Sequence, residues 1–107
     1  MEIKEAQKRV EEHIKKMGYT KIETNHCLAF LHLVEEVGET ARSLLHQETN
    51  RGEISNTTIP KGLKEEVADI FWQVLKLCYY LGIDLEEEFL EKHRKNMERY
   101  KEIYKKT

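Results

Sequence analysis

Apolar residues that recur every three or four positions are the feature that most constrains how this 107-residue chain can fold. That spacing places side chains along one face of an α-helix, and no segment shows the strict alternation of a half-buried strand. The length is about that of one domain, so we expect a single all-α domain over residues 1–107. Although 36% of the residues are charged, the helical periodicity distinguishes the sequence from a disordered chain.

Four helices are expected from this periodicity and from the residues placed to cap them. The expected ranges are approximately 2–17, 25–46, 63–82 and 84–104. Thr24 or Asn25 can cap the second helix and Asp84 the fourth, because their side-chain oxygens accept from free N-terminal amides. Between residues 47 and 62 polar residues replace the repeat and the only proline, Pro60, forbids a continuous helix, so we expect a loop. Such helices favour a four-helix bundle or a pair of helical hairpins.

The apolar stripes of the second and third helices are expected to form the core. In the second helix the stripe is Cys27, Phe30, Leu31, Val34, Val37, Gly38, Ala41 and Leu45. We expect Cys27 and Cys78 to be buried thiols and not a disulfide. Phe71, Trp72 and Tyr79 lie on different sides of the third helix, so its apolar band is wider than one short chain can cover. We therefore expect a homodimer, or a dimer of dimers that makes a homotetramer.

Charge and hydropathy exclude some partners. The net charge of −2 argues against a general affinity for a nucleic-acid backbone. No apolar run approaches the roughly 20 residues that span a bilayer, and the N-terminal residues lack the layout of a signal peptide. We therefore expect a cytoplasmic protein with no nucleic-acid or membrane partner.

Acidic residues on the second and third expected helices form the clearest candidate site. Glu35, Glu36 and Glu39 share one side of the second helix, and Glu66 and Asp69 repeat the arrangement on the third. Like charges at this spacing weaken a helix by about 0.2–0.5 kcal/mol per pair. A divalent cation would offset this repulsion, and Mg²⁺ prefers such oxygen ligands, with Mn²⁺ as an alternative. The alternative is that these acids form an ordinary solvent-exposed helix face. The second acidic pair, on the third helix, disfavours this alternative.

The same region of the sequence offers few ligands for other metals. A di-iron bundle would need two Glu-x-x-His pairs, and only Glu23 with His26 matches that pattern. His32 and His46 lie on the acidic side of the second helix, so a zinc or manganese site that includes a histidine stays open. On the third helix, Trp72 is expected to pack in the core in preference to stacking on a base. The residues that continue the acidic stripe towards a cleft are Gln73, Lys76 and Tyr80.

The acidic pattern resembles the signature of the MazG-like all-α nucleotide pyrophosphohydrolases, a family related to the all-α dUTPases and dCTPases. That signature, E-E-x-x-E followed by E-x-x-D, reads here as Glu35-Glu36-Val37-Gly38-Glu39 and Glu66-Val67-Ala68-Asp69. The resemblance extends to a K-x-x-K-N-x-x-R-Y stretch of the fourth helix, formed by Lys92, Lys95, Asn96, Arg99 and Tyr100. It covers roughly residues 25–100.

The resemblance implies an activity and a set of roles. The implied Mg²⁺ ligands are Glu36, Glu39, Glu66 and Asp69. Glu35 is either a further ligand or the base that orients a water, and we assign it as the catalytic base. The implied substrate-binding residues are Lys92, Asn96, Arg99 and Tyr100. The expected reaction is Mg²⁺-dependent hydrolysis of a nucleoside triphosphate to a monophosphate and pyrophosphate, as nucleotide-pool house-cleaning. The competing hypothesis is a non-catalytic helical dimerisation or interaction module whose acidic patch binds a basic partner.

Overall fold

The computed structural model describes residues 1–18, 25–51 and 61–105, and all of the regular structure in these residues is helical. The helices are α1 (Ile3–Met17), α2 (His26–Arg51), α3 (Lys61–Leu81), α4 (Leu85–Arg99) and α5 (Lys101–Lys105). The prediction of an all-α fold is thereby confirmed. None of the described helices combines the length and the apolar character needed to cross a membrane.

The helix boundaries differ from the predicted ones at two places. α2 continues past the expected end at His46 to Arg51, because Gln, Glu and Arg in this stretch are good helix formers. The fourth predicted helix is divided into α4 and α5 at Tyr100, whose backbone leaves the helix with φ −94° and ψ 4°. Pro60 and most of the predicted loop lie outside the described residues.

Local capping explains where the other helices begin and end. The Asn25 side chain accepts from the Leu28 amide at 3.0 Å, as predicted for the start of α2. Gly82 ends α3 in the left-handed region at φ 69°, which glycine adopts without steric cost. Asp84 then accepts from the Glu87 amide at 3.2 Å and caps α4.

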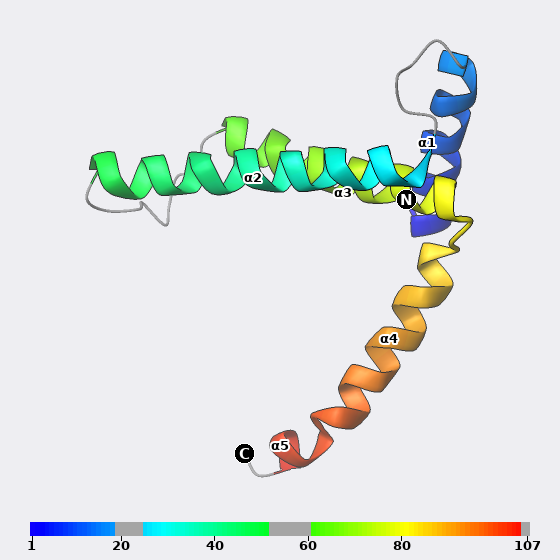
Figure 1. The fold of residues 1–107 in the computed structure, drawn as a ribbon. Helices are drawn as coiled ribbons and strands as arrows, with labels where there is room; N and C mark the ends of the chain where they lie inside the picture. The colour runs from blue at the N-terminus through cyan, green and yellow to red at the C-terminus, as the bar shows by residue number, and fades with distance from the viewer. Residues whose placement is uncertain (19–24, 52–60, 106–107) are drawn as a thin grey trace.

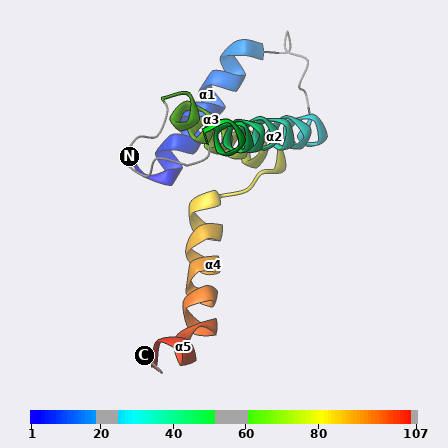
Figure 2. The same cartoon turned by 90° about the vertical axis from the view of Figure 1, so that its left-hand side faces the viewer.

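The helices form a hairpin, a crossing helix and a projecting arm. α2 and α3 lie side by side and antiparallel, and α1 crosses them at the end where α3 finishes (Figure 1). Figure 2 shows the hairpin nearly end-on, with α4 extending away from it. α4 packs chiefly against α1 at its start and against α5 at its end. The single chain described here therefore does not itself form the predicted four-helix bundle, because α4 stands apart from the hairpin.

The face that α2 turns towards α3 is not the predicted one. Its buried or half-buried residues are Leu28, Ala29, Leu33, Glu36, Thr40 and Ser43. By contrast, Phe30, Val34 and Leu45 of the predicted core stripe are at least half exposed. The structure corrects the prediction because small residues at Ala29, Thr40 and Ser43 let α2 approach α3 closely on their own side.

The two cysteines also differ from each other. Cys78 is buried in α3 as predicted, whereas Cys27 is exposed, so its predicted burial is wrong. Cys27 lies about 160° around α2 from Ala29, the residue at the centre of the packed face, and its side chain points away from α3.

Candidate functional site

The register of the α2–α3 hairpin brings the predicted acidic residues to facing helices. Ser43 of α2 donates its hydroxyl hydrogen to Oε1 of Glu66 on α3, at 3.0 Å. Because α2 and α3 are antiparallel, the residue one turn before Ser43 on α2 lies level with the residue one turn after Glu66 on α3. Glu39 therefore lies near the level of Asp69, and Glu36 lies one turn further along.

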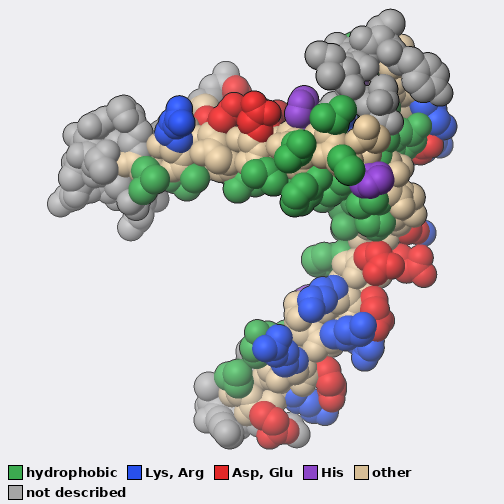
Figure 3. Space-filling model, in the orientation of Figure 1, with side chains coloured by type: hydrophobic (Ala, Val, Ile, Leu, Met, Phe, Trp, Pro, Cys, Tyr) green, Lys and Arg blue, Asp and Glu red, His purple; other side chains and the backbone are tan. Residues whose placement is uncertain are grey.

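The five predicted acids differ in exposure. Glu36 and Glu66 are half-buried between the helices, whereas Glu35, Glu39 and Asp69 are exposed beside them. Figure 3 shows Asp and Glu side chains gathered along one edge of the hairpin and hydrophobic side chains along the opposite edge, on the side to which α4 projects. We call the edge that carries the acidic side chains the acidic edge. Its five residues are Glu35, Glu36, Glu39, Glu66 and Asp69.

The pKa of Glu36 responds to the other members of the acidic edge. Burial raises the pKa of the Glu36 carboxyl above its ordinary value, and neighbouring negative charges raise the pKa further. Those charges belong, in decreasing order of effect, to Glu39, Asp69, Glu35 and Glu66. All four other members of the acidic edge thus act on Glu36 from two different helices.

Glu66 carries an oxygen that favours a ligand at this place. Its Oε1 accepts from Ser43, but its Oε2 is buried and makes no hydrogen bond in the described part of the chain. The amide oxygen of Gln73, two turns further along α3, is in the same condition. A buried carboxylate oxygen without a partner costs at least about 1–3 kcal/mol, which a bound cation would offset. The donor set, carboxylate oxygens alone, fits a hard cation such as Mg²⁺.

The side chains are not arranged as finished metal ligands. Within residues 1–18, 25–51 and 61–105, no group of three or more His, Cys, Asp or Glu side chains is placed to hold a metal ion. The backbone puts the carboxylates on facing helices, so their side chains must rotate before several of them can share one ion. His32 is exposed on α2, and the side chain of His46 lies outside the description.

The predicted substrate-binding residues lie on a different part of the molecule. Lys92, Arg99 and Tyr100 are exposed and Asn96 is half-buried on α4. The Arg99 guanidinium lies 5.6 Å from the centre of the Tyr100 ring. Because α4 projects on the side of the hairpin opposite the acidic edge, the single chain does not bring these residues to the acids (Figures 1 and 3).

One residue of the site was not predicted from the sequence. Ser43 was missed, although it lies four residues after Glu39 and hence on nearly the same side of α2.

Lys76 differs from its predicted position. It was expected to line a cleft, but it is buried, with its Nζ 5.8 Å from the centre of the Trp72 ring. Trp72 in turn meets the ring of His13 on α1 edge-on at 5.6 Å, so it packs between helices as predicted.

The fold and the acidic edge together define an all-α protein with a carboxylate site between two antiparallel helices. Metal and ligand sites in helical bundles are built in this way, from side chains on facing helices.

The comparison with protein families identifies the family to which the chain belongs. The model of the MazG nucleotide pyrophosphohydrolase domain matches residues 24–104, which is more than half of the chain. The chain therefore belongs to the MazG nucleotide pyrophosphohydrolase domain family, and the resemblance inferred from its motifs is confirmed. Membership indicates a nucleotide pyrophosphohydrolase, a hydrolase of a family whose enzymes generally depend on divalent metals. Neither the curated proteins nor the solved structures compared with the chain gave a match.

Proposed function

We propose that the chain is a Mg²⁺-dependent nucleoside triphosphate pyrophosphohydrolase that releases a nucleoside monophosphate and pyrophosphate, in nucleotide-pool house-cleaning. The observation that carries this proposal is the acidic edge, where five carboxylates lie on two facing helices and one buried oxygen of Glu66 has no hydrogen-bond partner among the described residues. The order of these acids along the chain is that of the E-E-x-x-E and E-x-x-D pattern on which the resemblance to the family rests.

The residues of the acidic edge have different roles in the proposed hydrolysis. Glu36, Glu39, Glu66 and Asp69 would hold the cation, and Ser43 donates a hydrogen bond to one oxygen of Glu66. A Mg²⁺ ion held by these residues would supply neutralisation of phosphate charge and a more acidic water. Glu35 accepts the proton of the water that attacks the α-phosphorus, and the bond between the α-phosphorus and the bridging oxygen breaks as pyrophosphate leaves.

The second part of the proposal is that two copies of the chain form the working enzyme. The accessible surface is 8806 Å², whereas a compact monomer of 12.8 kDa exposes about 6,300 Å². The radius of gyration is 17.6 Å, against about 13 Å for a compact domain of this length. An excess of about 2,500 Å² per chain, or about 5,000 Å² for two chains, lies at the upper end of the total surface that permanent homodimers bury.

The surface that a second copy would cover is the apolar edge of the hairpin. Its exposed members are Phe30, Val34, Val37 and Leu45 of α2 and Val67 and Phe71 of α3. Pairing two such edges turns two hairpins into a four-helix bundle and leaves both acidic edges open, as a homodimer or as half of a dimer of dimers.

A second copy also supplies the groups that hold the phosphates. Lys92, Asn96 and Arg99 recur at intervals of four and three residues and so share one side of α4. Within one chain that side does not meet the acidic edge, so we assign the contact to α4 of the partner copy. Lys92 acts there as a point charge and Arg99 as a bidentate fork, with Asn96 and Tyr100 beside them on the substrate.

A product assay tests the proposal. The protein is incubated with Mg²⁺ and a panel of ribonucleoside and deoxyribonucleoside triphosphates, and the products are separated. Monophosphate with pyrophosphate supports the proposal, whereas diphosphate with orthophosphate indicates a different hydrolase. No turnover of any nucleotide favours the competing hypothesis, a non-catalytic helical module whose acidic edge binds a basic partner.

A further inference from the structure

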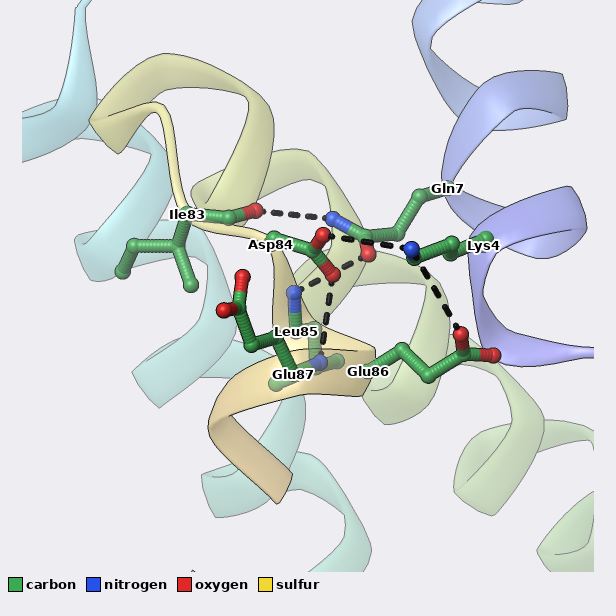
Figure 4. A network of polar contacts seen from close by, with 7 residues as sticks. All are labelled: Lys4, Gln7, Ile83, Asp84, Leu85, Glu86 and Glu87. Atoms are coloured by element: carbon green, nitrogen blue, oxygen red, sulfur yellow. Dashed lines mark hydrogen bonds and ion pairs between the residues drawn. The ribbon is translucent and has the colours of Figure 1, made fainter. Parts of the chain in front are cut away.

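One side chain of α1 forms hydrogen bonds to both ends of the turn between α3 and α4 (Figure 4). Gln7 donates from Nε2 to the carbonyl oxygen of Ile83 at 2.9 Å. The same amide accepts, through Oε1, the hydrogen bond of the Leu85 amide at 3.0 Å. Gln7 thus binds the backbone just before and at the first residue of α4, across a sequence separation of more than 70 residues.

The charged residues around this turn contribute less. Lys4 of α1 places its Nζ 3.7 Å from Asp84 and 3.9 Å from Glu86. Such exposed ion pairs stabilise a fold by about 0–1 kcal/mol and weaken with salt. Gln7 makes two directed hydrogen bonds to main-chain groups, so it controls the direction of α4 more strongly than the Lys4 pairs do.

A small tilt of the α4 axis moves the residues near its end by several ångströms, because they lie far from the turn. Counted from Leu85 at 1.5 Å per residue, Lys92 lies about 10 Å along the axis and Arg99 about 21 Å. A tilt of about 10° at the turn would therefore displace Arg99 by about 4 Å. Misplacing a group by 1 Å at a reacting centre can lower a rate by about 100-fold.

We propose that Gln7 is a positioning residue, which fixes the direction in which α4 presents Lys92, Asn96 and Arg99 to the phosphates. The inference rests on the proposed function, in which those residues bind the substrate. It places a functional residue in α1, outside the segment 24–104 that the family model matches. It also separates two tasks, since the cation ligands lie on the α2–α3 hairpin and do not depend on this turn.

The experiment combines hydrogen exchange with steady-state kinetics on the full chain. Gln7→Met keeps the length of the side chain and removes both hydrogen bonds, and Lys8→Met is the matched control at an exposed position of the same helix. In Gln7→Met the Leu85 amide should exchange about tenfold faster. The KM for the nucleotide should rise about tenfold or more, while the Mg²⁺ concentration for half-maximal activity stays unchanged. The control should match the parent in all three measurements.

Gln7→Glu provides a second variant that keeps the acceptor for Leu85 and loses the donor to Ile83. Its Leu85 amide should exchange close to the parent rate, and its KM should fall between those of the parent and Gln7→Met. An unchanged KM in Gln7→Met, whether or not Leu85 exchanges faster, overturns the positioning role. An equal shift of KM and Mg²⁺ dependence also overturns it, because it shows a general loss of structure. A parent protein that hydrolyses no nucleotide overturns the proposed function, and the positioning role of Gln7 with it.

Discussion

Replacing Phe30 with Ala should weaken the dimer without unfolding the chain. Phe30 lies on the apolar edge with 52% of its surface exposed, so in one chain it has few contacts to lose. An aromatic side chain can bury about 200 Å², so the exposed half corresponds to about 100 Å². At about 25 cal/mol per Å² this contributes about 2.5 kcal/mol per chain, or about 5 kcal/mol for a symmetric pair. The alanine methyl group retains part of this, so the expected loss is about 3–5 kcal/mol, or about two to four powers of ten in the dissociation constant.

Sedimentation velocity over a range of concentrations measures that constant, and far-ultraviolet circular dichroism checks that the helices remain. Leu90→Ala is the matched control, because Leu90 is 60% exposed on α4 among the charged residues Glu87, Glu91 and Arg94. The control should dissociate as the parent does. A parent that sediments as a monomer with full activity would refute the reasoning, and so would a Phe30→Ala dimer as tight as the parent.

Three further predictions concern the site. Glu39→Ala and Asp69→Ala should each abolish turnover while the unfolding temperature in metal-free buffer stays equal or rises, since carboxylate repulsion is relieved; full activity in either variant would refute the ligand assignment. Mg²⁺ should raise the unfolding temperature of the parent more than that of these variants. The pKa of Glu36 is raised in the folded chain, so the folded state binds the proton of this carboxyl more tightly than the unfolded state does. Protonation of Glu36 therefore contributes stability at low pH, and this contribution is lost as the pH rises through the raised pKa. Denaturant unfolding of Glu36→Gln without metal should therefore show higher stability at neutral pH and a flatter pH dependence, and an unchanged slope would contradict the burial of this carboxyl. Arg99→Lys keeps the charge but loses the bidentate fork, so KM should rise about tenfold with a smaller change in kcat; an unchanged KM would remove Arg99 from the substrate site.

The candidate site could be predicted from the sequence to the extent that it depends on single helices. Glu35 and Glu39 share a side of α2 because of helical geometry alone, and the same holds for Glu66 and Asp69 on α3. That these helices face each other with their acids at matching levels depends on the hairpin register. The Ser43–Glu66 hydrogen bond marks this register, and it joins residues 23 positions apart.

The sequence by itself determined where the helices lie and how two of them begin, because these features depend on residues only three or four positions apart. Asn25 and Asp84 were recognised as caps for that reason, since each acts on backbone groups of its own turn.

Only the tertiary structure decided which stripe of α2 is buried and where α4 points. A helix pattern shows which residues share a face, but Phe30 and Ala29 lie on two different faces, and the choice between them depends on how closely α3 can approach. The direction of α4 depends on Gln7, whose two hydrogen bonds span more than 70 residues and leave no local pattern in the sequence.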